Sequence, residues 1–255
     1  MAVWDDPDVD LLYEINGLAE AAPAWADRTI GYVGEFGVVA VLVLLGVIAW
    51  WRVVRRKAAR DEAVAGFAGL IWAPLAAGIA LLVNIPIRDL VERPRPFVEH
   101  RGLDVLVHGK GDYSFVSDHS TLAMALAVGI FMVDRRYGLL SIVLAVPAGF
   151  SRVYLGVHYP TDVIGGLALG AAVALLLAPV AMWGLTPLVR RLANSPRTGS
   201  VVWAGPAESE AEAGAGASTP SEETEPEPET VQERETEPKA ASEAEAPRND
   251  RDLAA

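Results

Sequence analysis

Two stretches of this sequence are more apolar and longer than the helices of most soluble proteins. Residues 63–87 and 163–189 run for 25 and 27 residues without an ionisable side chain. An α-helix of about 20 residues crosses the roughly 30 Å of hydrocarbon in a bilayer. We therefore predict that each stretch spans a membrane.

Three further segments are predicted to span the membrane once their polar flanks are included. Residues 30–51 are long enough but contain Glu35, and residues 120–133 and 138–151 are uncharged for 14 residues each. Runs of that length also suit buried helices of soluble proteins. Extended to 117–134 and 137–157 they become spans that bury polar groups, and polar groups at such depth are functional candidates. The predicted fold is an all-α integral membrane helical bundle with five spans.

The segment ahead of the spans is predicted to form a helix. Residues 9–22 place apolar side chains at helical spacing, at Leu11, Leu12, Ile15, Leu18 and Ala19. This pattern indicates an N-terminal amphipathic helix along the membrane interface, and an ordinary packing helix fits it equally well. Acidic residues stand where a signal peptide carries basic ones, so no signal peptide is predicted. We expect residues 1–29 to form this interfacial region and residues 30–194 the five-span core.

The C-terminal segment differs from the rest of the chain in charge. Residues 195–255 hold 15 of the 33 acidic and 5 of the 21 basic residues, which leaves 18 and 16 for the first 194. This Glu- and Pro-rich segment cannot bury enough apolar surface to offset its ordering entropy, so we predict a disordered acidic tail whose partner, if it has one, is unknown. The nearly neutral body argues against nucleic-acid binding. The absence of cysteine excludes disulfides and Cys-ligated metals.

The distribution of basic residues predicts an orientation in the membrane. Ten Lys and Arg residues flank one side of the predicted spans, five of them within residues 52–60, and seven flank the other side. Cytoplasmic loops carry an excess of Lys and Arg. We therefore expect a multi-pass cell-membrane protein with a cytoplasmic tail, and with the loops after the second and fourth spans outside the cytoplasm.

Those two loops carry the polar residues with the clearest chemistry. The first runs from Arg88 through Arg95 to Ser117 and His119, and the second contains Arg152, His158 and Asp162. Because an even number of spans separates them, both lie on one face of the membrane. Clustered guanidiniums fit the oxygens of a phosphate, and helices beginning near Ser117 and Pro160 would add N–H groups for the same anion.

The spacing of the second loop also predicts a paired imidazole. If Pro160 begins a helix, Asp162 lies in its first turn and can accept one ring N–H of His158. That pairing makes the other ring nitrogen a better nucleophile, and His119 suits the role of proton donor. Each residue alone has a simpler interpretation, since arginines at span ends often anchor at the interface and Asp162 could merely cap a helix. The joint spacing favours a catalytic site.

These motifs resemble the three-part signature of the type 2 phosphatidic acid phosphatase superfamily. The three parts are Arg-x6-Arg-Pro from Arg88 to Pro96, Ser-x-His at Ser117 and His119, and Ser-Arg-x5-His-x3-Asp from Ser151 to Asp162. Arg88 replaces the usual Lys, and Asp118 replaces the usual Gly. The Ser-Asp-His version and residues 13–18 are similar to the bacitracin-resistance undecaprenyl-diphosphate phosphatases.

The resemblance implies a role for each motif residue. It implies that the phosphoryl oxygens are bound by Arg88, Arg95, Arg152, Ser117 and the backbone N–H of Asp118. It further implies that His158 forms a phosphohistidine, Asp162 orients His158, and His119 protonates the leaving oxygen and later activates water. No metal or other cofactor is expected, because the arginines supply the positive charge.

The function implied is hydrolysis of a membrane lipid phosphate within the bilayer. We expect undecaprenyl diphosphate to be cleaved to undecaprenyl phosphate and phosphate at the outer leaflet, which would support cell-wall biogenesis and bacitracin resistance. Phosphatidate or phosphatidylglycerol phosphate are alternative substrates. Vanadate-dependent halide oxidation, a channel and a catalytically inactive membrane scaffold are weaker alternatives.

Overall fold

The computed structural model describes residues 6–106 and 111–205. The chain divides into two compact units, Met1–Glu212 and Ala213–Ala255, and the second lies outside the described residues. Within the described ranges the regular structure is entirely helical, with no strand. The predicted all-α bundle is confirmed in this respect.

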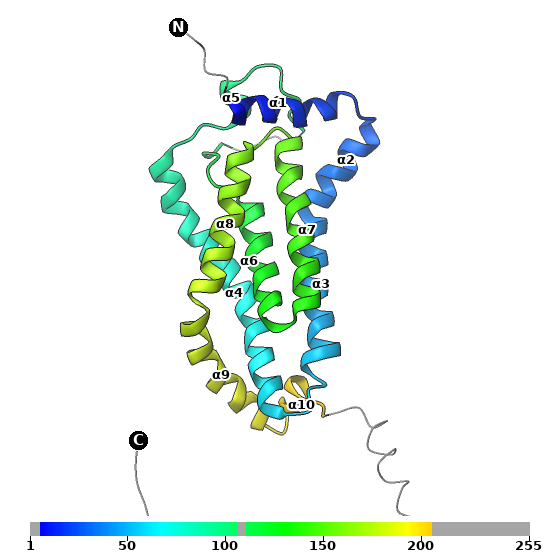
Figure 1. Ribbon diagram of the computed structural model, residues 1–255, viewed down its shortest axis with the longest axis vertical. Coiled ribbons are helices and arrows are strands. Elements are labelled where there is room, and N and C mark those ends of the chain that lie inside the picture. Colours follow the sequence, from blue (N-terminus) through cyan, green and yellow to red (C-terminus); the bar gives the residue numbers. More distant parts are fainter. Residues whose placement is uncertain (1–5, 107–110, 206–255) are drawn as a thin grey trace, which may run out of the picture. The chain divides into compact units, whose positions relative to one another are not determined.

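Each predicted span coincides with helical structure (Figure 1). The first is a continuous run of 31 residues, Ala24–Val54, that begins six residues before the predicted Ile30. It comprises α2 (Ala24–Tyr32), the π-helical turn η1 (Val33–Gly37), α3 (Val38–Ala49) and a second π-helical turn η2 (Trp50–Val54). The next three predicted spans correspond to α4 (Arg60–Val91), α6 (Asp118–Val133) and α7 (Arg135–Tyr154).

The fifth predicted span is broken, so an uninterrupted helix over residues 163–189 is wrong. The structure has α8 (Pro160–Leu176) and α9 (Ala178–Asn194), which meet at an angle of 52°. The break lies just ahead of Pro179, whose ring cannot continue a preceding helix because it lacks an N–H and clashes with the carbonyl one turn earlier. Among the residues that the structure describes, three helices suit a membrane crossing by length and composition, or four if this bent pair is one span.

Helix α6 is the centre of the bundle. It packs against α3, α4, α7 and α8, and at 16 residues it is about 24 Å long. Small residues let its neighbours approach closely: a side chain at Gly129 would meet the Cα of Ala73 in α4 at 2.6 Å. Such small-residue contacts are typical of helix packing in membranes. The outward faces of α3, α4, α7 and α8 carry exposed side chains such as Leu44, Leu82, Val143 and Ile164.

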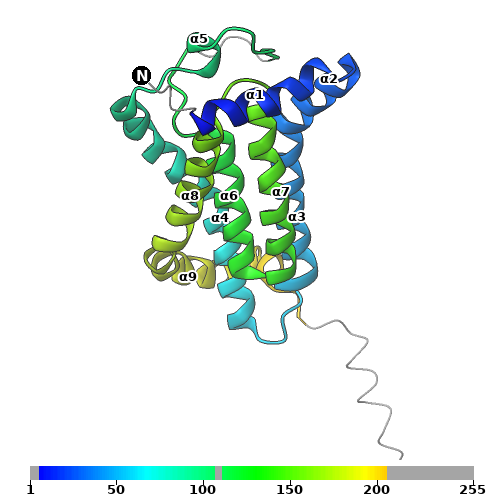
Figure 2. The same cartoon turned by 45° about the horizontal axis from the view of Figure 1, so that its top comes forward.

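The N-terminal helix lies across one end of the bundle (Figures 1 and 2). Helix α1 (Pro7–Glu20) begins at the N-cap Asp6, close to the predicted boundary. Its buried face, with Leu12 and Ala19, packs on the ends of α7 and α8, and the Asn16 amide donates to the carbonyls of Asp104 and Tyr154. Its opposite face exposes Leu18. The helix therefore packs on protein, and its outer face combines Leu18 with exposed acidic residues such as Asp10 and Glu14.

The chain remains ordered past the predicted start of the tail. Residues 195–205 belong to the described structure and contain α10 (Gly199–Val202), whose Val202 is buried against α4 and α9. The indole of Trp50 donates to the carbonyl of Val201, and that of Trp203 to Lys57. The boundary expected at residue 195 therefore falls too early, because two tryptophans anchor the following segment. Residues 206–255 lie outside the described residues.

Candidate active site

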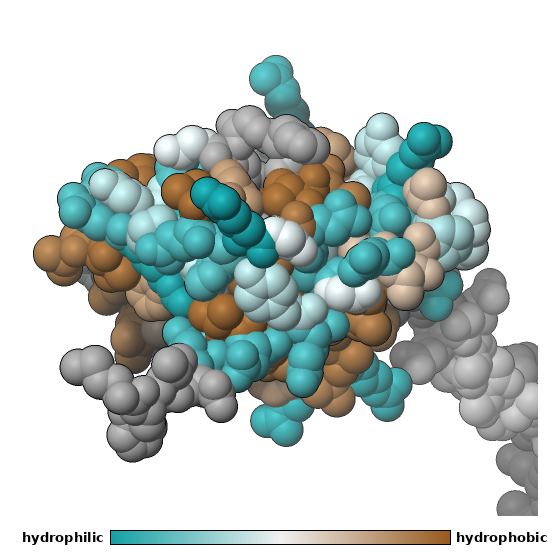
Figure 3. All heavy atoms as spheres, turned by 90° about the horizontal axis from the view of Figure 1, so that it is seen from above, coloured by the Kyte–Doolittle hydropathy of each residue, from teal (hydrophilic) through white to brown (hydrophobic). Residues whose placement is uncertain are grey.

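The candidate site lies at the end of the bundle that carries α1. The end of α4, the beginning of α6 and the turn between α7 and α8 meet there, together with the loop that contains α5 (Pro96–Glu99) (Figure 1). Seen from this end, hydrophilic side chains cover much of the surface, interrupted by hydrophobic patches (Figure 3). The fold therefore brings the two polar loops to one face, as their separation along the chain predicts.

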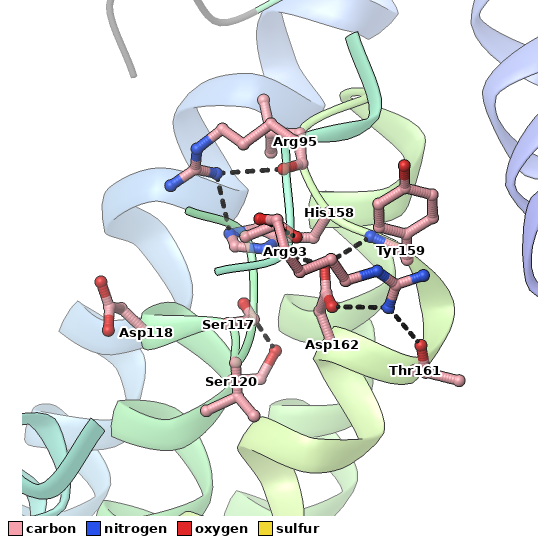
Figure 4. Close-up of polar contacts among 12 residues, drawn as sticks. Arg93, Arg95, Ser117, Asp118, Ser120, His158, Tyr159, Thr161 and Asp162 are labelled. Atoms are coloured by element: carbon pink, nitrogen blue, oxygen red, sulfur yellow. Dashed lines mark hydrogen bonds and ion pairs between the residues drawn. The ribbon is translucent and has the colours of Figure 1, made fainter. Parts of the chain in front are cut away.

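The His158–Asp162 pair forms at the beginning of α8 (Figure 4). Gly156 has φ 71°, in the left-handed region that favours glycine, and turns the chain toward His158. Pro160 is the first residue of α8, so Asp162 lies in the first turn as predicted. Its Oδ2 accepts a hydrogen bond from the backbone N–H of Tyr159 at 2.9 Å and lies 3.5 Å from Nδ1 of His158. Both side chains are buried.

Arg95 reaches the other nitrogen of the same imidazole. Its Nη1 donates to the carbonyl of Val157 at 3.0 Å and lies 3.4 Å from Nε2 of His158. The guanidinium is almost fully buried. A permanent positive charge therefore stands directly beside the ring nitrogen that faces away from Asp162.

Asp112 bridges two of the predicted phosphate-binding arginines. Its Oδ1 accepts from Nη2 of Arg95 at 2.5 Å and its Oδ2 from Nη1 of Arg88 at 2.6 Å. Burial raises the pKa of Asp112, but the hydrogen bond from Arg95 and the charges of both arginines outweigh it and hold the pKa below its usual value. A two-oxygen anion thus already fits between these guanidiniums.

Asp118 orients Arg88 through its side chain. Its Oδ1 accepts from Nη2 of Arg88 at 2.5 Å and from the amide of Asn84 at 2.7 Å, while Asn84 also donates to the carbonyl of Val116. The backbone N–H of Asp118 has no acceptor in the described part of the chain. The residue that departs from the family pattern therefore fixes an arginine, and its N–H still points out of the first turn of α6.

Arg152 and His119 meet at Glu35. Oε2 of Glu35 lies 2.6 Å from Nη1 of Arg152, and Oε1 lies 3.3 Å from Nε2 of His119. Glu35 sits in the π-helical turn η1, and such turns are frequent at functional sites. The preceding Gly34 lets this turn approach α7, since a Cβ there would lie 3.2 Å from Nη2 of Arg152. Nε and Nη2 of Arg152 are buried and have no acceptor among the described residues.

Ser117 occupies the N-cap of α6 but does not cap it with its side chain. Its hydroxyl accepts from that of Ser120 at 3.1 Å, and its N–H donates to the carbonyl of Asp162 at 3.0 Å. The expectation that both helix beginnings face one anion is wrong for α8, because the N–H of Thr161 is taken by Asp8 of α1. The first turn of α6 is the one that remains available.

Several residues in this network were not among the predicted site residues, and the charged ones that contact predicted site residues directly are Glu35, Arg93 and Asp112. Arg93 binds Oδ1 of Asp162 at 2.9 Å (Figure 4). Glu35 carried a signal, because an ionisable residue inside a predicted span is a functional candidate. Nothing in the loop sequence distinguished Arg93 or Asp112 from other charged residues. Within residues 6–106 and 111–205, no group of three His, Cys, Asp or Glu side chains is arranged to hold a metal ion.

Comparison with known proteins identifies the family. The PAP2 superfamily profile matches residues 69–184. The chain is 30% identical over 151 residues to undecaprenyl-diphosphatase BcrC of Bacillus subtilis, a match that covers 59% of this chain and 72% of the relative. It is 33% identical over 165 residues to the putative undecaprenyl-diphosphatase YbjG of Escherichia coli, covering 64% and 77%.

A third relative has a different substrate in its name. The chain is 40% identical over 141 residues to decaprenylphosphoryl-5-phosphoribose phosphatase of Mycobacterium tuberculosis, covering 55% of this chain and 70% of the relative. The profile match at residues 69–184 includes the arginine and histidine motifs from Arg88 to Asp162. From these motifs, their convergence at one end of a helical bundle and these relatives, we conclude that the chain belongs to the PAP2 superfamily.

Proposed function

We propose that this protein is a membrane phosphatase that hydrolyses undecaprenyl diphosphate to undecaprenyl phosphate and inorganic phosphate at the outer leaflet. The observation that carries the proposal is the set of buried guanidinium donors around the two histidines. Nε and Nη2 of Arg152 and Nε of Arg88 are buried and have no acceptor among the described residues. Leaving such donors unpaired costs free energy, and phosphoryl oxygens would satisfy them.

The proposed reaction has two steps. The lone pair on Nε2 of His158 attacks the terminal phosphorus, while Nδ1–H is directed at Asp162. The bond from phosphorus to the bridging oxygen breaks, and His119 gives the departing oxygen a proton. Water then attacks the phosphohistidine, His119 accepts a proton from this water, and the phosphorus–nitrogen bond breaks to release phosphate.

The arginines would stabilise the charge that develops during both steps. Arg88 and Arg95 already hold the two oxygens of Asp112, so substrate binding requires that this carboxylate give way to the phosphate. The N–H of Asp118 and the hydroxyl of Ser117 would complete the set of donors at the first turn of α6. The charge is supplied by fixed guanidiniums, so no metal is needed in this proposal.

The choice of an isoprenoid diphosphate is supported by the relatives and by the membrane setting. Two of the relatives are named as undecaprenyl-diphosphatases. The exposed apolar faces of the bundle would keep the protein in the bilayer, where such a lipid resides. The basic segment 52–60 lies at the opposite end of the bundle from the site, which supports an extracytoplasmic site and a cytoplasmic acidic tail.

The relative from Mycobacterium tuberculosis supports a second candidate substrate. Its 40% identity is higher than that of the two undecaprenyl-diphosphatases, and its name describes a phosphate monoester on a polyprenyl-linked ribose. The phosphate site and the two-step reaction would be the same. The two candidates differ in whether the leaving oxygen belongs to a phosphate or to a sugar.

Phosphate release by the purified full-length protein in detergent tests both candidates. The panel contains undecaprenyl diphosphate, a polyprenylphosphoryl-5-phosphoribose, phosphatidic acid and phosphatidylglycerol phosphate. We expect the highest kcat/KM with undecaprenyl diphosphate and loss of all turnover in His158→Ala. Arg190→Ala is the matched control, because this exposed side chain lies in α9, which extends away from the site. Turnover confined to the two glycerolipids would contradict the substrate, and no release from any lipid would contradict the reaction.

A further inference from the structure

Arg93 lies between two carboxylates that come from different parts of the chain, Asp8 and Asp162; its contact with Asp162 is drawn in Figure 4. Its Nη1 donates to Oδ1 of Asp162 at 2.9 Å and to the hydroxyl of Thr161 at 2.7 Å. Its Nη2 donates to Oδ2 of Asp8 at 2.6 Å. The guanidinium carbon lies 3.6 Å from the ring centroid of Tyr159, so the planar group is also stacked on an aromatic face. Four residues thus fix the position of this one side chain.

Asp162 depends on Arg93 for both its charge and its orientation. The Asp162 side chain is completely buried, and a buried carboxylate without a counter-charge is strongly destabilising. One oxygen, Oδ2, faces His158 and the N–H of Tyr159, and the other, Oδ1, is bound by Arg93. Because both oxygens are held, the plane of the carboxylate is set relative to the His158 ring.

The first turn of α1 completes the arrangement. Oδ1 of Asp8 accepts the N–H of Thr161 at 2.9 Å, and Oδ2 accepts the Thr161 hydroxyl at 2.5 Å as well as Arg93. Burial raises the pKa of Asp8, but the hydrogen bonds from Thr161 and Arg93 outweigh it, and the net pKa is lowered. Asp8 therefore remains ionised over the physiological range and ties α1 to both Arg93 and the beginning of α8.

We propose that Arg93 is a positioning residue for Asp162, and that Asp8 of α1 holds Arg93 in place. The N-terminal helix then contributes to the site, because Asp8, Arg93 and Asp162 connect it to His158. This inference rests on the proposed roles of His158 and Asp162. It is independent of which lipid phosphate is the substrate.

Variants of the full-length enzyme test the connection. Arg93→Ala removes the positive charge beside Asp162 and the hydrogen bond that orients its carboxylate. We expect kcat to fall by about 10- to 100-fold, since small displacements of a reacting group have effects of this size. Arg93→Lys keeps the charge but cannot bridge two carboxylates and stack on Tyr159, so we expect an intermediate kcat. Asp8→Asn should lower kcat by less than Arg93→Ala. KM should change little in all three, because none of these side chains is placed on the phosphate.

Asp10→Asn is the matched control for the N-terminal helix. Asp10 lies in the same first turns of α1, is exposed, and its side chain has no partner among the described residues. We expect this variant to keep the wild-type kcat. Loss of activity in Asp10→Asn equal to that in Asp8→Asn would mean that the charge of α1 matters and not the contact with Arg93.

The pH profile separates positioning from a purely structural role. The charged and titratable groups facing the His158–Asp162 pair or its partners include Asp8, Arg93, Arg95, Glu99, His100, Asp112 and Tyr159. A positive charge beside Asp162 disfavours a second proton on His158. Loss of Arg93 should therefore move the acidic limb of kcat/KM to higher pH, and Arg93→Lys should leave this limb near its wild-type position.

A result that contradicts the role of Arg93 can be distinguished from a result that contradicts the proposed substrate. All variants are assayed on whichever lipid phosphate the wild type hydrolyses fastest, and activity is normalised to folded protein measured by thermal unfolding. A lowered melting temperature with unchanged kcat and pH profile in Arg93→Ala would overturn the inference. Turnover of a different lipid by the wild type would overturn the substrate and leave this test in force.

Discussion

Oε2 of Glu35 lies 2.6 Å from Nη1 of Arg152, which joins the first span to the fourth inside the bundle. Arg152 is fully buried, and its Nε and Nη2 have no acceptor among the described residues. One edge of the guanidinium is thus held by Glu35 while the other donors stay available. Glu35 therefore orients Arg152 without occupying all of its donors.

Replacing Glu35 should show how far the stability and activity of the protein depend on the Glu35–Arg152 ion pair. Glu35→Ala leaves a buried guanidinium without its counter-charge, which typically costs about 3–5 kcal/mol. We expect a lowered melting temperature in detergent and at least a tenfold loss of kcat/KM. Glu35→Gln keeps an acceptor for Nη1, so the loss of stability should be smaller. Both are measured by thermal unfolding and by phosphate release.

Added inorganic phosphate provides the internal check on Glu35. Because an anion in the site would supply the missing charge, phosphate should raise the melting temperature of Glu35→Ala more than that of the wild type. Glu14→Ala, an exposed acidic position on α1, is the control and should respond like the wild type. Equal stabilisation of all three proteins by phosphate would argue against a charge-pairing role for Glu35.

Hydropathy and periodicity predicted the long helices of this fold, but not the short helices α5 and α10. Long runs with few or no charges located helical structure at each of the five predicted spans, because burying charges in hydrocarbon is costly enough to exclude them from most of a span. The break between α8 and α9 was not predicted, although Pro179 marks it, because a proline inside a membrane helix can either kink or end it. Ordered residues 195–205 were missed because their stability comes from tertiary contacts of Trp50 and Trp203.

Sequence spacing predicted which face of the bundle carries the candidate site, and the remaining partners of its residues come from tertiary contacts. The His158–Asp162 pair follows from local geometry, since Pro160 fixes where α8 begins. The partners of Arg152 and Asp162 come from residues 117 and 69 positions away, a separation at which sequence spacing carries no information about contact. The contacts of Glu35 with Arg152 and of Arg93 with Asp162 are therefore visible only in the three-dimensional structure.

Asp112 is expected to compete with anions for Arg88 and Arg95. Its two oxygens occupy donors of both guanidiniums, so a phosphate must displace a carboxylate of the protein. Asp112→Asn should strengthen inhibition by inorganic phosphate or vanadate several-fold, measured as a lowered inhibition constant. Asp89→Asn, an exposed carboxylate at the end of α4, is the control and should leave inhibition unchanged. Weaker inhibition in Asp112→Asn would mean that Asp112 mainly orients the arginines.

The proposed orientation can be tested by labelling, because the sequence contains no cysteine. Single substitutions Glu20→Cys, on the site side of the bundle, and Ser242→Cys, in the C-terminal tail, give two unique thiols. In intact cells a membrane-impermeant maleimide should label Glu20→Cys and should label Ser242→Cys only after permeabilisation. The reverse pattern would place the site in the cytoplasm and would exclude an outer-leaflet substrate.

Asp8 makes part of the stability dependent on pH. Its pKa is lowered in the folded protein, so its stabilising contribution is fully present above the unfolded value of about 3.9 and is lost as the pH falls through the lower folded value. The melting temperature of the wild type should therefore fall more steeply below about pH 4 than that of Asp8→Asn. Parallel melting curves for the two proteins from pH 6 to pH 3 would contradict this assignment.

Close packing between α6 and α8 should make Gly170 intolerant of a side chain. A Cβ at Gly170 would clash with the carbonyl oxygen of Thr121, and the backbone of α6 could move away only by disturbing the turn that carries His119. Gly170→Ala is therefore expected to lower both the melting temperature and kcat. At Gly184 in α9 a Cβ would meet nothing within 4 Å, so Gly184→Ala should be neutral or stabilising by up to about 1 kcal/mol from helix propensity. The same substitution at two glycines thus separates helix propensity from helix packing, and equal melting temperatures for the two variants would show that α6 and α8 tolerate a wider spacing.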